Sequence, residues 1–219
     1  MIFDLDDTLI DTSVCLTPPK LEEALICMIK NGAQVPSFFD AFKELLEINV
    51  KAGSGADALK KFCEHFSLDD SFCQLGIKML YGESQLDMPI SPVNGALDLL
   101  KSLSSECHLA LVSVGIEKQQ LAKMEKAGID WSVFSKIAII EDKNKGKCYQ
   151  EIFGHFPCPK EKVFVCGDKI LIDLSPAKRL GFTTIHVRNG RGKHVSGYQE
   201  DVDYSVQHLE EIKKIVGIK

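Results

Sequence analysis

The sequence predicts an α/β protein in which a doubly wound, Rossmann-like parallel sheet is interrupted after its first strand by an all-helical domain. Met1-Ile2-Phe3 is apolar and runs directly into Asp4, as at the end of a buried parallel strand. Residues 15–88 carry helical patterns and need no strand, whereas strands and helices alternate from residue 89 onward. We therefore expect a sheet domain formed by residues 1–14 and 89–219, and a helical domain formed by residues 15–88.

Start and stop signals divide the helical segment into four helices. Pro18-Pro19 precedes a helix over residues 20–30, which Asn31-Gly32 ends. Ser37 is suited to the N-cap of a second helix, which continues to about residue 48. Gly53-Ser54-Gly55 then breaks the chain, and two further helices are expected over residues 58–66 and 69–81.

The second part of the chain supplies the rest of the sheet. Apolar runs predict strands over residues 108–114, 137–140, 162–166, 183–187 and 203–206, and helices over residues 93–103, 117–126, 148–156, 174–180 and 209–216. Open parallel sheets bind ligands at the carboxyl ends of their strands. Asp4 is expected at that edge, because it follows the first strand directly.

Composition excludes several classes of partner. The 219 residues are 45% hydrophobic, which is enough for a real core, and the formal charge is −5. This mild acidity gives no general attraction to nucleic acid or anionic membranes. No apolar run approaches a membrane span, and the start of the sequence does not resemble a signal peptide. The eight cysteines form no C-x-x-C pair and mostly lie in apolar stretches, so we expect reduced thiols and a cytoplasmic location.

The first motif is the crowded acidic segment Asp4-Leu5-Asp6-Asp7-Thr8. Like charges at short range raise one another's pKa, and a hard cation among them relieves that cost. A calcium loop of the EF-hand type also begins with D-x-D, but its required glycine and glutamate are replaced here by leucine and cysteine. A solvated acidic turn is the other alternative, because aspartate is common in turns.

This segment resembles the DxDxT signature of the haloacid dehalogenase-like (HAD) hydrolases. The resemblance implies that Asp4 is a nucleophile that takes up a phosphoryl group, that Asp6 is a general acid/base, and that Thr8 helps to hold the phosphate. The residue types suit these roles, because a carboxylate is ionised at neutral pH and the resulting acyl phosphate needs an activated water.

Two further segments match HAD motifs. The apolar strand that ends in Ser113-Val114-Gly115 resembles the second motif, which implies that Ser113 and the backbone near Gly115 bind phosphate. Lys147 has the spacing of the family's active-site lysine before a helix, where it would offset negative charge. Lys143 and Lys145 are close alternatives, and an exposed basic loop is an ordinary explanation for any of the three.

The fourth motif is Gly167-Asp168 followed by Asp173, which matches the GDxxxxD form of the HAD acidic motif. By this match Asp168 ligates a metal directly, and Asp173 supports the metal without direct contact or orients the lysine. The ligand set implied for Mg²⁺ is therefore Asp4, Asp6, Asp168 and Asp173.

Four motifs in order imply a HAD-like core with a helical cap inserted after the first motif. The expected activity is magnesium-dependent hydrolysis of a small-molecule phosphate monoester through an aspartyl-phosphate intermediate. A phosphomutase with the same core chemistry is an alternative, and so is a phosphate-binding protein without turnover, which the very short first strand keeps open. Neither the identity of the ester nor the oligomeric state follows from the sequence.

Overall fold

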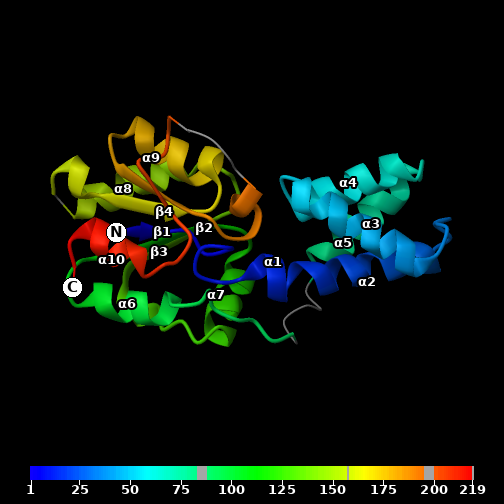
Figure 1. Ribbon diagram of the computed structural model, residues 1–219, viewed down its shortest axis with the longest axis horizontal. Helices are drawn as coiled ribbons and strands as arrows, with labels where there is room; N and C mark the ends of the chain where they lie inside the picture. Colours follow the sequence, from blue (N-terminus) through cyan, green and yellow to red (C-terminus); the bar gives the residue numbers. More distant parts are fainter. Residues whose placement is uncertain (83–87, 157, 195–199, 219) are drawn as a thin grey trace. The chain divides into compact units, whose positions relative to one another are not determined.

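The computed structural model describes residues 1–82, 88–156, 158–194 and 200–218. The chain forms two compact units, one of residues Met1–Thr12 and Pro89–Lys219 and the other of residues Ser13–Met88 (Figure 1). The first division lies two residues before the expected one, and the chain returns to the first unit at the expected residue 89.

The first unit is built on a six-stranded sheet with the order β3-β2-β1-β4-β5-β6, in which all neighbouring strands are parallel. The strands are β1 (Ile2–Phe3), β2 (Leu109–Val114), β3 (Phe134–Ile140), β4 (Phe164–Gly167), β5 (Thr183–Val187) and β6 (Tyr204–Val206). The chain moves outward in one direction from β1 to β3 and then crosses to β4 on the other side. The doubly wound topology is thus confirmed, and its switch point lies between β1 and β4.

Helices cover both faces of this sheet (Figure 1). One face carries α8 (Lys145–His155) and α9 (Ser175–Arg179), and the other carries α6 (Ala96–Ser104), α7 (Glu117–Lys126) and α10 (Glu211–Val216). Alternate residues of the central strands, Ile2, Ala110, Val112 and Val165, pack with Tyr149 of α8 in one buried cluster. Strands buried on both faces explain the continuous apolar runs in the sequence.

The second unit contains helices α2 (Thr17–Lys30), α3 (Phe38–Lys51), α4 (Gly55–His65) and α5 (Asp70–Leu80). The short α1 (Thr12–Cys15) begins with the last residue of the first unit's opening segment and continues into the second unit. Ser37 and Ser54 are the N-caps of α3 and α4, and each hydroxyl accepts a backbone hydrogen bond of 3.1 Å. Apolar stripes from the four helices form a separate core that includes Leu21, Leu45 and Phe62. The described residues of this unit form no strand.

One boundary matters for the site. Helix α8 begins at Lys145, three residues before the expected start at residue 148. The expectation relied on apolar periodicity, and the first turn of α8, Lys145-Gly146-Lys147, contains no apolar side chain. The additional turn changes which lysine faces the sheet.

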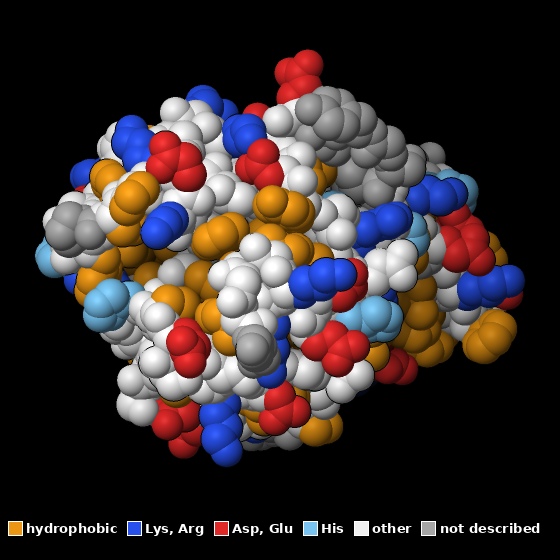
Figure 2. Space-filling model, turned by 60° about the vertical axis from the view of Figure 1, so that its left-hand side comes forward, with side chains coloured by type: hydrophobic (Ala, Val, Ile, Leu, Met, Phe, Trp, Pro, Cys, Tyr) orange, Lys and Arg blue, Asp and Glu red, His pale blue; other side chains and the backbone are white. Residues whose placement is uncertain are grey.

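The amino ends of the strands border a groove of about 460 Å³. It is lined by residues from the starts of β1, β2 and β4, such as Met1, Leu109 and Val163, and by Phe153 and Phe156. Figure 2 brings this side of the molecule forward and shows apolar side chains grouped among charged ones. Within the described part of the chain, no helix is long and apolar enough to cross a membrane.

Candidate active site

The first motif forms a tight loop at the carboxyl end of β1. The N–H of Asp4 donates to the carbonyl of Cys166 at 2.9 Å, which continues the contact between β1 and β4. The N–H groups of Leu9 and Ile10 both donate to the carbonyl of Leu5, at 2.9 and 3.0 Å. The side chains of these three apolar residues are fully buried. They anchor the loop, so that the polar residues between them are held at the edge of the sheet.

A second loop packs directly against this one. Asp7 adopts a left-handed conformation with φ of 60° and is buried. Gly190, with φ of +49°, approaches it so closely that a Cβ atom there would lie 2.2 Å from Cγ of Asp7. Only glycine satisfies both the backbone conformation and the close contact. The loop after β5 therefore helps to fix the conformation of the first motif.

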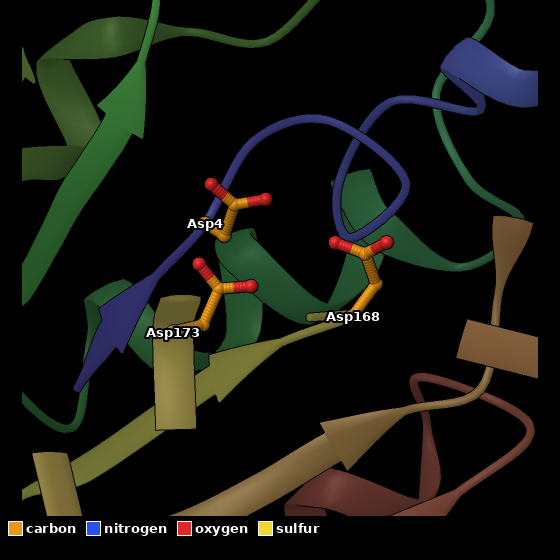
Figure 3. Close-up of side chains that lie close together, drawn as sticks. All are labelled: Asp4, Asp168 and Asp173. Atoms are coloured by element: carbon orange, nitrogen blue, oxygen red, sulfur yellow. The ribbon is translucent and has the colours of Figure 1, made fainter. Parts of the chain in front are cut away.

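Three carboxylates meet at the switch point of the sheet. Figure 3 shows Asp4 after β1, Asp168 at the end of β4, and Asp173 in the following helical turn. One oxygen from each lies within 4.8 Å of the others, and all three residues are buried. The absence of a side chain at Gly167 makes room for this arrangement, since a Cβ atom there would lie 2.4 Å from Cβ of Asp173.

Lys145 is the lysine in contact with this cluster. Its Nζ atom lies 2.5 Å from Oδ1 of Asp4 and 2.7 Å from Oδ1 of Asp173, and its side chain is only 1% exposed. Lys147 is exposed, as is Lys143. The structure therefore does not place Lys147 against the acidic cluster. Lys145, one of its two alternatives, makes the expected contact. The cause is the early start of α8, which places Lys145 on the buried side of its first turn.

Opposing effects act on the pKa of Asp4. Burial raises the pKa of Asp4 to about 6, Lys145 opposes the increase, and Asp173 adds to it. For Lys145, burial favours the neutral amine, but Asp173 and Asp4 outweigh it and hold the pKa above its usual value. The lysine therefore remains an ammonium group between two carboxylates.

The carboxylate of Asp168 is buried, and neither of its oxygens has a hydrogen-bond partner among the described residues. Burial raises its pKa well above the usual value, although the charge of Lys169 opposes this. A buried carboxylate without a partner is costly. Oxygen donors of this kind, beside Asp4, suit a hard cation such as Mg²⁺.

Asp173 is already paired in the described structure. One oxygen contacts Lys145, and the other accepts the backbone N–H of Lys169 at 2.9 Å. These contacts favour the role of orienting the lysine over the direct ligation that the implied Mg²⁺ ligand set gave to Asp173.

The carboxylate of Asp6 does not join the cluster, contrary to its place in the expected metal-ligand set. It accepts hydrogen bonds from Thr12 Oγ1 at 2.6 Å, Gln120 Nε2 at 2.9 Å and Lys123 Nζ at 2.9 Å. Burial would raise its pKa, but Lys123 and the hydrogen bonds from Gln120 and Thr12 outweigh burial and hold the pKa of Asp6 well below its usual value. Two of these donors, Gln120 and Lys123, belong to α7, and together with Thr12 they hold the Asp6 carboxylate outside the cluster.

The three residues expected to bind phosphate differ in their availability. Oγ1 of Thr8 is fully buried and has no hydrogen-bond partner among the described residues. Ser113 is buried at the end of β2 and accepts a hydrogen bond from Gln120 at 2.6 Å. The N–H of Gly115 donates to the carbonyl of Ile140 at 2.8 Å, so the sheet occupies this amide and the expected phosphate contact has no support there.

Sequence reasoning missed three polar residues at this edge. Gln120 and Lys123 lie three positions apart on α7 and therefore share one side of the helix. Lys169 follows Asp168, and its pKa is raised above the usual value because the charges of Asp168 and Asp4 outweigh its burial. The sequence offered one indication of the α7 residues: Gln120 and Lys123 are polar but lie close to Met124, which is buried.

Known proteins resemble this chain in sequence and in fold. The family model described as haloacid dehalogenase-like hydrolase matches residues 36–187. Glyceraldehyde 3-phosphate phosphatase of Pyrococcus furiosus is 26% identical over 99% of this chain and 92% of its own length. The enzyme of the same name from Methanocaldococcus jannaschii is also 26% identical, over 99% of this chain and 96% of its own length.

Among solved structures, the HAD hydrolase YfnB of Bacillus subtilis, crystallised with bound magnesium, aligns with a TM-score of 0.68. It shares 18% sequence identity with the alignment covering 99% of this chain and 97% of YfnB, a similarity that supports the fold. Since the family model spans more than half of the sequence and the fold agrees with it, this chain belongs to the haloacid dehalogenase-like hydrolases.

Proposed function

We propose that this protein is a magnesium-dependent phosphatase that hydrolyses a small phosphate monoester through an aspartyl-phosphate intermediate. The observation that carries the proposal is the position of Asp4, which contacts Lys145 at the switch point of the sheet and lies next to Asp168, whose carboxylate has no hydrogen-bond partner among the described residues. The curated relatives, which are named as phosphatases, support the same reaction class.

Asp4 is the proposed nucleophile. One carboxylate oxygen is in contact with Lys145, and the other attacks phosphorus while the bond to the ester oxygen breaks. Lys145 offsets the negative charge that the carboxylate and the phosphate bring together. Oγ1 of Thr8 and Oγ of Ser113 are the proposed donors to the phosphate oxygens, and the lack of a partner for Thr8 agrees with this role.

Asp6 is the proposed acid/base. In the first step a protonated Asp6 gives its proton to the departing ester oxygen, and in the second step the resulting carboxylate accepts a proton from the water that attacks phosphorus and releases Asp4, which restores the acid. The donors around Asp6 favour its ionised form, which suits its role as the base in the second step, and solvent supplies the proton for the first step.

Asp168 and Asp4 would hold the magnesium ion. When all three are ionised, Asp4, Asp168 and Asp173 carry three negative charges, and Lys145 and Lys169 offset two of them. A divalent cation, when bound, would offset the third charge together with part of the phosphate charge, and would polarise the phosphoryl group.

We further propose that the helical unit, residues 13–88, is a cap that selects the substrate, and that the relatives' activity makes triose phosphates the first compounds to test.

The test is phosphate release from a metabolite panel that includes glyceraldehyde 3-phosphate and an aryl phosphate, with Mg²⁺ or with EDTA. We expect turnover only with Mg²⁺, and none from Asp4→Asn. Turnover that survives EDTA would exclude the metal. A phosphomutase would instead yield an isomeric phosphate without release, and a binder would show a melting shift with beryllofluoride but no turnover.

A further inference from the structure

Helix α7 connects the proposed acid/base to the proposed phosphate-binding serine. Nε2 of Gln120 lies 2.6 Å from Oγ of Ser113 and 2.9 Å from Oδ2 of Asp6. Nζ of Lys123 lies 2.9 and 3.2 Å from the two carboxylate oxygens of Asp6. The side chains of Lys123 and Asp6 are only 14% and 20% exposed, so this is a largely enclosed network.

The chemistry of the network fixes the direction of each hydrogen bond. A carboxylate only accepts hydrogen bonds, so the amide nitrogen of Gln120 must face Asp6. That nitrogen has two hydrogens, and the serine oxygen is the second close acceptor. Ser113 therefore accepts from Gln120, which leaves its own single proton to be donated elsewhere. The arrangement turns Ser113 into a donor, as a phosphate oxygen requires.

Lys123 has a complementary effect on Asp6. Asp6 is two residues from Asp4 in the sequence. A cation held by Asp4 and Asp168 would therefore attract the Asp6 carboxylate. The two contacts from Lys123 and the hydrogen bond from Thr12 oppose that movement. Asp6 thus remains outside the cluster, where it can transfer protons.

We infer that Gln120 and Lys123 are positioning residues: Lys123 holds Asp6 for proton transfer, and Gln120 orients the Ser113 hydroxyl toward the phosphate. This inference rests on the proposed phosphatase function. It goes beyond that function because it assigns roles to two residues of α7 that lie outside the four motifs.

A double-mutant cycle tests the role of Lys123. Lys123→Met is expected to lower kcat with an alkyl phosphate by about 10- to 100-fold, the range typical of groups that orient a reacting residue. In the Asp6→Asn background the same change should cost less than about 3-fold, because residues that act through one contact are not additive. Lys123→Arg should restore most of the rate, and Lys126→Met, an exposed lysine of the same helix, is the matched control.

Gln120→Met provides the second cycle, paired with Ser113→Ala. Gln120→Met is expected mainly to raise KM. The same substitution should leave KM unchanged in the Ser113→Ala background, where the serine hydroxyl is absent. Melting temperatures of all variants identify folding defects, and Lys123→Gln replaces the methionine variant if that variant does not fold.

The two proposals fail in different ways. An active wild type whose variants lose activity additively would overturn the positioning roles and leave the phosphatase intact. A wild type that is inactive on every ester would overturn the phosphatase, and the positioning roles with it.

Discussion

Replacing Asp4 with asparagine is expected to stabilise the metal-free protein at neutral pH, although it abolishes turnover. The pKa of Asp4 rises from 3.8 to about 6, with burial as the main cause and with Lys145 opposing it. A raised pKa means that the folded state binds the proton more tightly than the unfolded chain. The stability that this group contributes is therefore complete below pH 3.8 and is lost as the pH rises through about 6.

The size of the effect follows from the shift. Each pKa unit corresponds to about 1.4 kcal/mol, so ionised Asp4 costs the folded state about 3 kcal/mol at pH 7.5. At pH 4 the carboxyl is protonated in the folded state and partly protonated in the unfolded chain, and the cost falls to about 0.5 kcal/mol. For a chain of this length, 3 kcal/mol corresponds to an increase of about 6 to 12 °C in Tm.

The assay is thermal unfolding of wild type and Asp4→Asn in EDTA at pH 4 and pH 7.5. Glu125→Gln, which removes an exposed carboxylate from α7, is the matched control and should change Tm little. Adding Mg²⁺ at about 1,000 times its Kd should reverse the order of the two proteins, because the ion binds the folded wild type and stabilises it by about 4.1 kcal/mol, more than the variant's advantage of about 3 kcal/mol. A variant that is no more stable than wild type at pH 7.5 in EDTA, or an increase that persists at pH 4, would refute the reasoning.

Three further predictions address single contacts, two of them with a matched control variant. Lys145→Met should abolish phosphate release, whereas Lys147→Met should keep it within about 2-fold of wild type, because only the first contacts the carboxylates. Loss of activity with Lys147→Met would contradict the assignment. Thr8→Val should raise KM without lowering Tm, since its buried hydroxyl has no partner in the described residues; a clear loss of stability would point to a structural hydroxyl instead. Denaturant unfolding should show that Gly190→Ala costs about 2 kcal/mol or more, because its Cβ would lie 2.2 Å from a buried carboxyl carbon. Gly154→Ala, on an open helix surface, should instead stabilise by about 0.5 to 1 kcal/mol.

The sequence by itself determined the fold class and where the acidic residues come together. Strand-then-aspartate patterns at Asp4 and Asp168 are local, and parallel strands bring their carboxyl ends to one edge. Side-chain periodicity also predicted the helical insertion and most of its boundaries, because N-caps such as Ser37 and Ser54 act within one turn.

Only the tertiary structure decided which lysine contacts Asp4 and where the carboxylate of Asp6 lies. Lys145 and Lys147 are chemically identical and two residues apart, and the choice depends on the side of α8 that packs on the sheet. Gln120 and Lys123 are separated from Asp6 by more than 100 residues, so no local pattern connects them. Local propensities fix which elements form, whereas long-range packing determines which polar groups meet, and that is why the sequence located the site without its hydrogen-bond network.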